Sequence, residues 1–416
     1  MKKYLIQLGK RAKKASVKSL TSKKKNKVLK DYCDLISNNQ LNIIRENGKD
    51  LKLAKNKKLK ENLIKRLLID KRKISQIMNS IKVIRKFKDP VGLKLESWKR
   101  SNGLKISKIT TCIGVVAVIY ESRPNVTSDV ASLCFKSGNP VILKGGSEAY
   151  YSNKIFTNLF RKALKKNKID ENCVQLINYK NRAVVDFLLT RMIKYVDVII
   201  PRGGKSLVKK VRDLSKIPVI GHLEGICHTY IDRHADLSMA KKITLNAKLR
   251  NTAICGATET ILIHQSILKK FCNPVLSNLE DNGCKIIGDA KINKSYKQKI
   301  KIAKESDWNK EYLSSIVSVK SVKNIDEAIS HINKYGTMHT DAIITKNLKS
   351  AKKFLNEIKS SIAMHNTSTQ FADGGEFGFG GEVGISTNTL PPRGPVGLNQ
   401  LVSYKYQVSS NGKIRN

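Results

Sequence analysis

The alternation of strand-like and helix-like segments constrains the fold of this chain more than any other feature. Beginning at residue 112, the run CIGVVAVIY is followed by a helical segment, then by the strand-like VILK, and the pattern recurs through VQLI and VDVII. The first run is rich in β-branched residues and does not alternate apolar with polar positions, which is typical of a parallel strand covered on both faces. Strands that alternate with helices predict an α/β fold with a parallel sheet of βαβ units.

The alternation starts again near residue 230, where TYID, TILIH and DAIIT read as strands between helical segments. This second series predicts a second α/β domain. Residues 1–90 read as lysine-rich amphipathic helices, because apolar positions recur three and four residues apart. Residues 93–111 suit a β-hairpin with its turn at SNG, and LVSYKYQV near the end of the chain reads as a last strand.

The chain is strongly basic, with 79 Lys and Arg against 33 Asp and Glu and a formal net charge of +46. A basic nucleic-acid-binding protein is therefore one interpretation. The excess runs through the whole chain, however, and is mostly lysine, whereas arginine is the better bidentate reader of bases and phosphates. This distribution favours compositional drift over nucleic-acid binding, although the positive field would still attract anionic small molecules.

The eight cysteines show no CxxC pair and no spacing typical of a zinc site. We therefore expect reduced thiols and no metal. The longest apolar run, from Cys112 to Tyr120, is too short to cross a membrane, and no apolar leader follows the first residues. These features predict a soluble, cytoplasmic protein.

Two glycine pairs follow predicted strands and are candidates for binding phosphate. Lys144 precedes one pair in LKGG, and Gly203 and Gly204 form the other at the start of a helical segment. Glycines let backbone N–H groups approach a phosphate, and a helix N-terminus carries partial positive charge. Such pairs are more often tight turns, however, and no GxGxxG follows the first strand. A dinucleotide would therefore bind here without its ordinary fingerprint.

Cys255 lies among small residues in NTAICGATET, between a helical and a strand-like segment. A cysteine in a fold is often only a small buried hydrophobe. Small neighbours would nevertheless let a substrate approach, and a thiolate can attack an activated acyl carbon while a nearby donor holds the oxyanion. Asn125, in the loop after the first strand of the sheet, is a candidate donor, or simply a turn or helix-capping residue.

Six motifs in this order identify a family resemblance. They are YESRPNVTSDVASLCFKSGNPVILKGG, IPRGGKSL, GHLEGICHTYID, NAKLRNTAICGATETILIH, INKYGTMHTDAIIT and FADGGEFGFGGEVGISTNTLPPRGPVGLNQLVSYKY. With them the chain resembles the aldehyde dehydrogenase superfamily and, within it, the family of gamma-glutamyl phosphate reductases, also called glutamate-5-semialdehyde dehydrogenases.

The resemblance implies an aldehyde dehydrogenase-like α/β fold, with two parallel-sheet domains and a small β oligomerisation arm. On this basis we expect residues 1–92 and 112–226 to bind the cofactor and residues 227–386 to form the catalytic domain. Residues 93–111 and 387–416 would form the arm that bridges subunits.

The same resemblance implies a role for individual residues. Cys255 matches the family's nucleophile, and Asn125 matches the asparagine that holds the oxyanion. Lys144 matches a lysine that contacts the adenosine ribose, and Glu311 matches the glutamate that contacts the nicotinamide ribose. Ser147 stands where many NAD-using relatives carry a glutamate that would repel a 2′-phosphate, which favours NADP(H) as the cofactor.

The implied reaction is the NADPH-dependent reduction of L-glutamyl 5-phosphate to L-glutamate 5-semialdehyde and phosphate, through a cysteine thioester, in proline biosynthesis. Hydrolytic family members carry a general-base glutamate that activates water. Aligned on Gly225, this chain has His222 at that place and Glu224 two positions later. The absence of the general-base glutamate agrees with a reductase, because activated water would hydrolyse the thioester before it could be reduced. His222 could itself act as a base, so a hydrolytic NAD(P)-dependent aldehyde dehydrogenase stays an alternative.

The substrate would carry a phosphate, a carboxylate and an ammonium group. Arg123 and Arg393 lie in family motifs and could pair with its anionic groups. Ordinary salt bridges are an equal alternative for both arginines. The resemblance also implies a homo-oligomer and functional coupling to glutamate 5-kinase, which would supply the acyl phosphate.

Overall fold

The structure is a computed structural model that describes residues 1–15, 20–59, 61–121, 123–181 and 183–415. The chain divides into two compact units. The first comprises Met1–Gly221, Gly378–Gly384 and Val396–Asn416, and the second His222–Phe377 and Ile385–Pro395. In this division the hairpin and the last strand belong to the first unit, so the functional limits expected from the sequence remain a prediction.

Five amphipathic helices precede the first sheet, as the lysine-rich pattern predicts. They are α1 (Lys2–Lys14), α2 (Ser22–Asn38), α3 (Gln40–Asn56), α4 (Glu61–Leu67) and α5 (Lys71–Lys86). The side chains of Thr21 and Asp70 accept hydrogen bonds from the first turns of α2 and α5, which fixes where these two helices begin. Their apolar stripes are buried, and most of their lysines are exposed.

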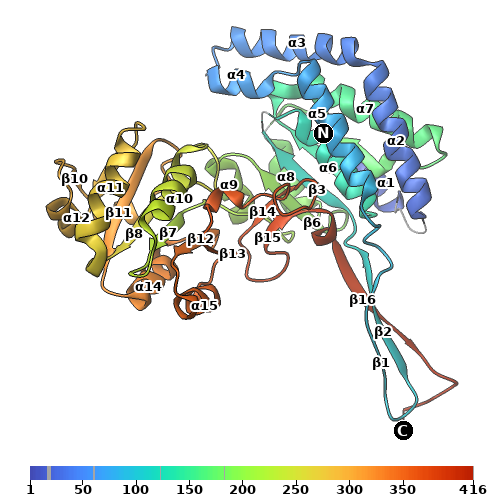
Figure 1. Cartoon of the computed structure of the whole chain (residues 1–416). Coiled ribbons are helices and arrows are strands. Elements are labelled where there is room, and N and C mark those ends of the chain that lie inside the picture. The colour runs from blue at the N-terminus through green and yellow to red at the C-terminus, as the bar shows by residue number, and fades with distance from the viewer. Residues whose placement is uncertain (16–19, 60, 122, 182, 416) are drawn as a thin grey trace. The chain divides into compact units, whose positions relative to one another are not determined.

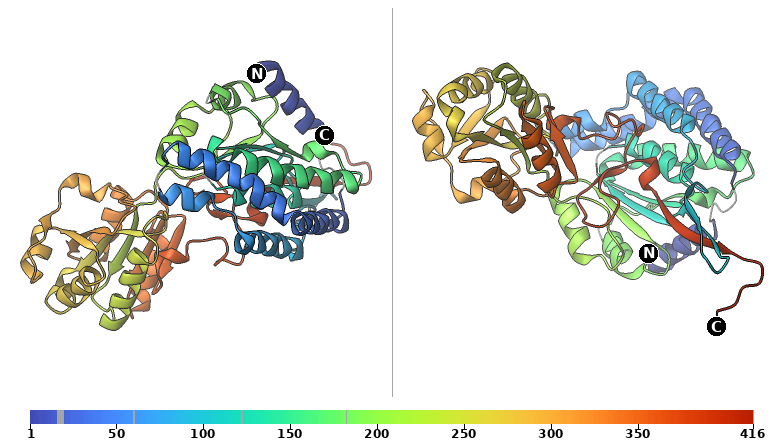
Figure 2. Two further views of the ribbon diagram at one scale, coloured as in Figure 1. Left: turned by 90° about the horizontal axis from the view of Figure 1, so that it is seen from above. Right: turned by 60° about the horizontal axis from the view of Figure 1, so that its bottom comes forward.

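The first unit contains a four-stranded parallel sheet in the order β5-β4-β3-β6. Its strands are β3 (Val116–Tyr120), β4 (Val141–Gly145), β5 (Val174–Leu176) and β6 (Val198–Arg202). The intervening helices are α6 (Asn125–Lys136), α7 (Tyr150–Lys166), α8 (Ala183–Arg191) and α9 (Lys205–Leu214). Helices α2, α5, α6 and α7 pack on one face, and α1 and α8 pack on the other (Figures 1 and 2).

The first strand of this sheet is shorter than the run 112–120 predicts. Cys112 ends a strand of another sheet, and β3 begins only at Val116. Gly114 separates the two, because its φ of 130° is a conformation that other residues rarely adopt. The Asp197 carboxylate accepts the N–H of Val115 at 2.6 Å at this break.

A three-stranded antiparallel sheet forms the arm. Its order is β1-β2-β16, with β1 (Lys94–Lys99), β2 (Lys105–Cys112) and β16 (Val402–Ser409). The predicted hairpin and last strand are therefore present and paired, and the hairpin extends away from the rest of the first unit (Figure 1). Large apolar side chains are exposed on this sheet, namely Leu95, Trp98, Tyr404, Tyr406 and Val408.

The second unit is built on a seven-stranded parallel sheet in the order β10-β9-β11-β8-β7-β12-β13. Its strands are β7 (Cys227–Ile231), β8 (Thr258–His264), β9 (Lys285–Gly288), β10 (Lys301–Ile302), β11 (Ile316–Val322), β12 (Thr340–Ile344) and β13 (Ile362–His365). Helices α10 (Leu237–Leu249) and α11 (Leu268–Glu280) pack on one face, and α14 (Ile325–Tyr335) and α15 (Leu348–Glu357) on the other. The predicted second α/β domain is present.

Smaller elements complete the second unit. They are α12 (Ala290–Ser295), α13 (Glu305–Trp308) and the short strand pair β14 (Gly384–Ser386) and β15 (Gly394–Val396). The first residue of β14 and the last residue of β15 are assigned to the first unit. No helix among the described residues is both long and apolar enough to cross a membrane.

Candidate active site

Cys255 differs from most of the other thiols in its exposure. It lies half-buried in the loop between α10 and β8, whereas six of the other seven cysteines are buried. Burial raises the pKa of the Cys33 and Cys284 thiols to about 11 and that of Cys173 and Cys272 to about 12, and it raises those of Cys134 and Cys227 further. These six thiols therefore keep their protons at neutral pH. Cys112, the other half-buried thiol, belongs to the arm.

Gly225 explains how the cysteine loop is held. A Cβ atom at Gly225 would lie 2.6 Å from the Cβ of Cys255, so only glycine lets the two backbone segments approach this closely. The thiol of Cys227 donates a hydrogen bond to the Cys255 carbonyl oxygen at 3.1 Å. The GHLEG motif thus supports the cysteine loop through its last glycine, whatever the roles of His222 and Glu224.

Gln370 supports the same loop from the other side. Its amide nitrogen donates to the carbonyl oxygens of Ala247 at 3.0 Å and Asn251 at 3.2 Å, and its amide oxygen accepts from Arg250 Nε at 3.0 Å. Gln370 is buried, so these bonds hold the junction between α10 and the loop in place. Sequence reasoning missed this residue, because nothing in the pattern of the chain links it to Cys255.

Two histidines lie near the thiol. One side-chain nitrogen of His222 and one of His339 lie within 4.8 Å of each other and of the Cys255 sulfur. His222, which aligns with the general-base position of hydrolytic family members, therefore lies beside the candidate nucleophile, with Nδ1 2.9 Å from the Ile385 carbonyl oxygen. His339 was not predicted from the sequence, and it is fully buried with its Nδ1 2.9 Å from the Thr340 hydroxyl.

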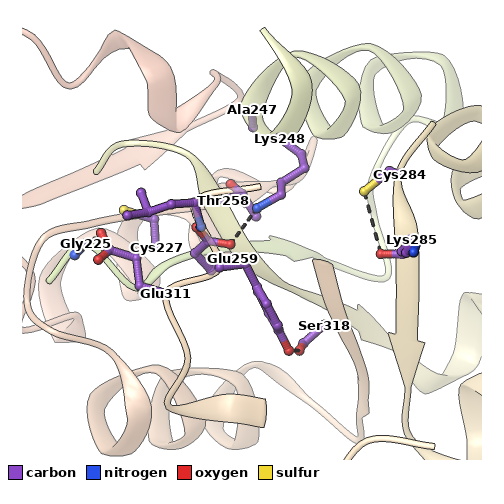
Figure 3. A network of polar contacts seen from close by, with 12 residues as sticks. Gly225, Cys227, Ala247, Lys248, Thr258, Glu259, Cys284, Lys285, Glu311 and Ser318 are labelled. Carbon is purple, nitrogen blue, oxygen red and sulfur yellow. Dashed lines mark hydrogen bonds and ion pairs between the residues drawn. The ribbon is translucent and has the colours of Figure 1, made fainter. Parts of the chain in front are cut away.

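Glu311 contacts the same loop region through Gly225. Its carboxylate accepts the Gly225 N–H at 2.8 Å (Figure 3). The contact to a nicotinamide ribose that the family resemblance implies stays a prediction. In this structure the carboxylate is held by the backbone that packs on Cys255.

A buried ion pair lies at the base of the cysteine loop. Lys248 and Glu259 are fully buried, and their charged atoms are 2.5 Å apart (Figure 3). Burial raises the pKa of Glu259 to about 7, even though Lys248 lowers it. The other carboxylate oxygen of Glu259 accepts the Leu313 N–H at 3.2 Å, so the pair joins the end of α10 and the start of β8 to the segment that carries Glu311.

Asn125 begins α6, directly after the half-buried Arg123 and the buried Pro124. Its amide nitrogen donates to the Asp129 carboxylate at 3.2 Å, which orients the side chain. An amide nitrogen carries two N–H groups, so one remains to donate to an oxyanion. The oxyanion-binding role of Asn125 stays a prediction.

Lys144 and Ser147 line a common cavity at the carboxyl end of β4. The cavity is also lined by Gly146, Tyr150, Tyr179 and Lys180. Burial lowers the pKa of Lys144, whose ammonium donates to the Gly145 carbonyl oxygen at 2.9 Å. Lys180, which sequence reasoning missed, follows β5 and lies 4.7 Å from the centre of the Tyr150 ring. The two predicted ribose-binding positions are thus brought together beside a second ammonium group.

The predicted phosphate-binding site at Gly203 and Gly204 is already occupied by the Glu121 carboxylate. The Gly204 N–H, at the start of α9, donates to Glu121 at 2.8 Å, and a Cβ at Gly203 would meet the same carboxylate at 2.6 Å. The site does favour an anion, as a helix N-terminus should. A ligand phosphate would have to displace Glu121, and neither glycine lines the cavity that holds Lys144.

Arg393 is exposed in the second unit and donates a hydrogen bond to the Lys359 carbonyl oxygen. This contact positions the guanidinium group, and its predicted role in substrate binding stays a prediction.

Comparison with known proteins decides the family. The aldehyde dehydrogenase family model matches residues 3–286 and 296–402 of this chain. The gamma-glutamyl phosphate reductase of Bartonella tribocorum is 44% identical over 401 residues, which cover 96% of this chain and 98% of that protein. The chain belongs to the aldehyde dehydrogenase family. Within that family it falls among the gamma-glutamyl phosphate reductases, as the motifs predict.

Other members agree with this assignment. The gamma-glutamyl phosphate reductase of Nautilia profundicola is 44% identical over 403 residues, with 95% of this chain and 96% of that protein covered. The crystal structure of a gamma-glutamyl phosphate reductase from Thermotoga maritima superposes with a TM-score of 0.96 at 38% identity, covering 99% of this chain and all of that one. The aldehyde dehydrogenase-like fold predicted from the sequence is confirmed. Members of the aldehyde dehydrogenase family use a nicotinamide cofactor.

Proposed function

We propose that this aldehyde dehydrogenase family member reduces L-glutamyl 5-phosphate to L-glutamate 5-semialdehyde and phosphate, as a step of proline biosynthesis in the cytoplasm. The main support is the 44% identity to gamma-glutamyl phosphate reductases over nearly the whole chain. Neither alternative, a hydrolytic aldehyde dehydrogenase or a nucleic-acid-binding protein, gains support from these similarities.

In this proposal Cys255 acts as the nucleophile. Its thiolate attacks the acyl carbon, and the amide of Asn125 donates to the oxyanion while phosphate leaves, so that a thioester forms. A nicotinamide cofactor, when bound, would supply the hydride that reduces the thioester carbon. Collapse of the resulting thiohemiacetal expels the thiolate of Cys255 and releases the aldehyde. Arg123 and Arg393 are proposed to pair with the anionic groups of the substrate.

The proposed cofactor is NADP(H). Lys144 and Lys180 offer ammonium groups and Ser147 a hydroxyl at the end of β4, which are suitable partners for the ribose and phosphate at the adenosine end of a dinucleotide. Glu148 is not among the cavity-lining residues, although its negative charge acts on Lys144 and counters the effect of burial on the pKa of that lysine. Glu311 is proposed to reach the nicotinamide ribose, and the N–H groups at Gly203 and Gly204 to take a phosphate when Glu121 moves away.

The arm supports a proposed homo-oligomer. Trp98 and Tyr406 pack edge to face with ring centres 6.1 Å apart, yet both remain more than a third exposed, as do Tyr404 and Val408. Apolar side chains on an antiparallel sheet of this kind are typical of a surface that another copy covers. Functional coupling to glutamate 5-kinase would supply the acyl phosphate directly.

The reverse reaction tests the proposal. Purified protein should reduce NADP⁺ in the presence of glutamate 5-semialdehyde only when phosphate is added, because phosphate must cleave the thioester. Reduction at the same rate without phosphate would instead identify a hydrolytic dehydrogenase. Tight nucleic-acid binding that weakens with salt and ignores the cofactor, in a protein without either activity, would favour the nucleic-acid-binding alternative.

A further inference from the structure

Three side chains from separate loops of the second unit form a cluster with metal-binding chemistry. His222 lies before β7, Cys255 before β8 and His339 directly before β12. One potential ligand atom from each lies within 4.8 Å of the other two. The sequence predicts no metal site here, because its cysteine and histidine spacings are unlike those of zinc motifs, and only the fold brings these residues together.

Both histidine rings make hydrogen bonds through Nδ1. A carbonyl oxygen can only accept, so the 2.9 Å contact from His222 Nδ1 to Ile385 means that Nδ1 carries the proton and Nε2 the lone pair. His339 is bonded through Nδ1 to the Thr340 hydroxyl, and no described residue forms a hydrogen bond with its Nε2. His339 is fully buried, and an imidazole nitrogen without a partner is costly there.

We propose that His222, Cys255 and His339 bind a Zn²⁺ ion that reversibly blocks the nucleophile. Imidazole nitrogen and thiolate sulfur are usual zinc ligands at about 2.0–2.3 Å, and three protein ligands with one open position are an arrangement that zinc adopts in proteins. Ligand atoms around such an ion lie roughly 3.5 Å apart, so side-chain rotations of about an ångström close the observed cluster. The contacts to Ile385 and Thr340 supply the outer hydrogen bonds that orient zinc-binding histidines.

The proposed metal changes the protonation of the thiol. Zn²⁺ binds the thiolate, so the Cys255 proton is released to solvent when the metal binds. Coordination to Zn²⁺ withdraws charge from the sulfur and lowers its nucleophilicity, so acylation stops until the metal leaves. The inhibitory effect rests on the proposed role of Cys255, whereas metal binding does not.

Cobalt substitution tests the site directly. Titration of the full chain with Co²⁺ should give a thiolate-to-cobalt charge-transfer absorption that saturates at a single ion per chain and disappears when Zn²⁺ is added. Cys255→Ser should abolish the absorption, and His339→Gln should weaken Co²⁺ binding by at least about tenfold. If the His339→Gln variant does not fold, the His222→Gln variant is measured in its place, with the same expected loss of Co²⁺ affinity. Cys112→Ser, which removes the other half-buried thiol, is the matched control and should bind as the wild type does.

Alkylation of the thiol gives a second measurement that needs neither substrate nor cofactor. Zn²⁺ should slow the reaction of Cys255 with iodoacetamide by at least about tenfold, and a chelator should restore it, with the modified residue identified by peptide mass. An absorption that survives Cys255→Ser, or unchanged affinity in both histidine variants, overturns the proposal. These results do not depend on whether the chain reduces an acyl phosphate.

Discussion

The two parallel sheets carry their candidate residues at opposite ends. In the first unit, Lys144 and Lys180 lie at or after the carboxyl ends of β4 and β5. In the second unit, Gly225, Cys255 and His339 lie just before the first residues of β7, β8 and β12. They therefore cluster at the amino end of the sheet.

The contrast shows how far a general rule of parallel sheets extends. Ligands of open α/β sheets bind beyond the carboxyl ends of the strands, and the cavity of the first unit obeys this rule. In the second unit, hydrogen bonds link residues at the carboxyl ends of β7, β12 and β13. The Thr345 hydroxyl donates to Asp232 at 2.7 Å, and His365 Nε2 lies 2.9 Å from the Thr345 carbonyl oxygen. The loop that carries Cys255 lies at the other end of this sheet and is held by contacts from Gly225 and Gln370.

The largest expected effect concerns the amino end of the second sheet. Cys255→Ser should reduce the reductase rate below about a tenth of the wild type, because a hydroxyl is a far weaker nucleophile than a thiolate. NADPH binding, measured by the fluorescence of the reduced nicotinamide, should remain nearly unchanged, because the proposed cofactor residues are elsewhere. Retention of most of the activity would mean that Cys255 is not the nucleophile. The amino end of the second sheet would then no longer be assigned to the chemical step.

Gly225→Ala tests whether loop packing holds the nucleophile. The added Cβ would lie 2.6 Å from the Cβ of Cys255, so the free energy of unfolding should fall by about 1–3 kcal/mol, and activity should fall with it. Gly48→Ala in α3 is the matched control, because no described atom lies within 4 Å of a Cβ built there, leaving out its chain neighbours and the backbone of its own helix. That variant should be neutral or more stable by about 0.5–1 kcal/mol, since alanine favours a helix. Equal behaviour of the two variants in urea unfolding would contradict the packing argument.

Lys180→Met tests the carboxyl end of the first sheet. Loss of a hydrogen bond between an ammonium and a 2′-phosphate costs about 1.5–3 kcal/mol, so the preference for NADPH over NADH should fall at least tenfold while NADH binding changes little. Lys154→Met, an exposed lysine on α7, is the control and should preserve the preference. If both cofactors lose affinity equally in Lys180→Met, the lysine supports the adenine and not the phosphate.

Local sequence patterns predicted the residues at the carboxyl end of the first sheet better than those at the amino end of the second sheet. Lys144 and Ser147 follow directly from a strand and its loop, and they lie together in one cavity. The support of Cys255 by Gly225 and Gln370, and its proximity to His339, come from residues distant in sequence, so no local period could reveal them. The strand β10 has only two residues and β9 and β13 have four each, which is too short for a periodic signal.

The smallest expected effect is a pH dependence of stability at the base of the cysteine loop. The pKa of Glu259 in the folded protein is about 7, above the ordinary glutamate value near 4.3, because the carboxyl group is buried. Between about pH 4.5 and 7 the folded state therefore binds a proton that the unfolded state has released, so this group makes stability fall as the pH rises through that window. Glu259→Gln cannot titrate and should lack this slope.

Comparing the two proteins isolates the contribution of Glu259 from that of all other groups. The stability difference between the wild type and Glu259→Gln, measured by urea unfolding, should shift against the wild type as the pH rises from about 5 to about 7. Above about pH 8, where Glu259 is ionised in both states, the difference should stay constant. A difference that shifts in favour of the wild type over this range would mean that Lys248 holds Glu259 ionised. The amino end of the second sheet would then rest on a permanent ion pair, in contrast to Lys144 of the first sheet, whose pKa burial lowers.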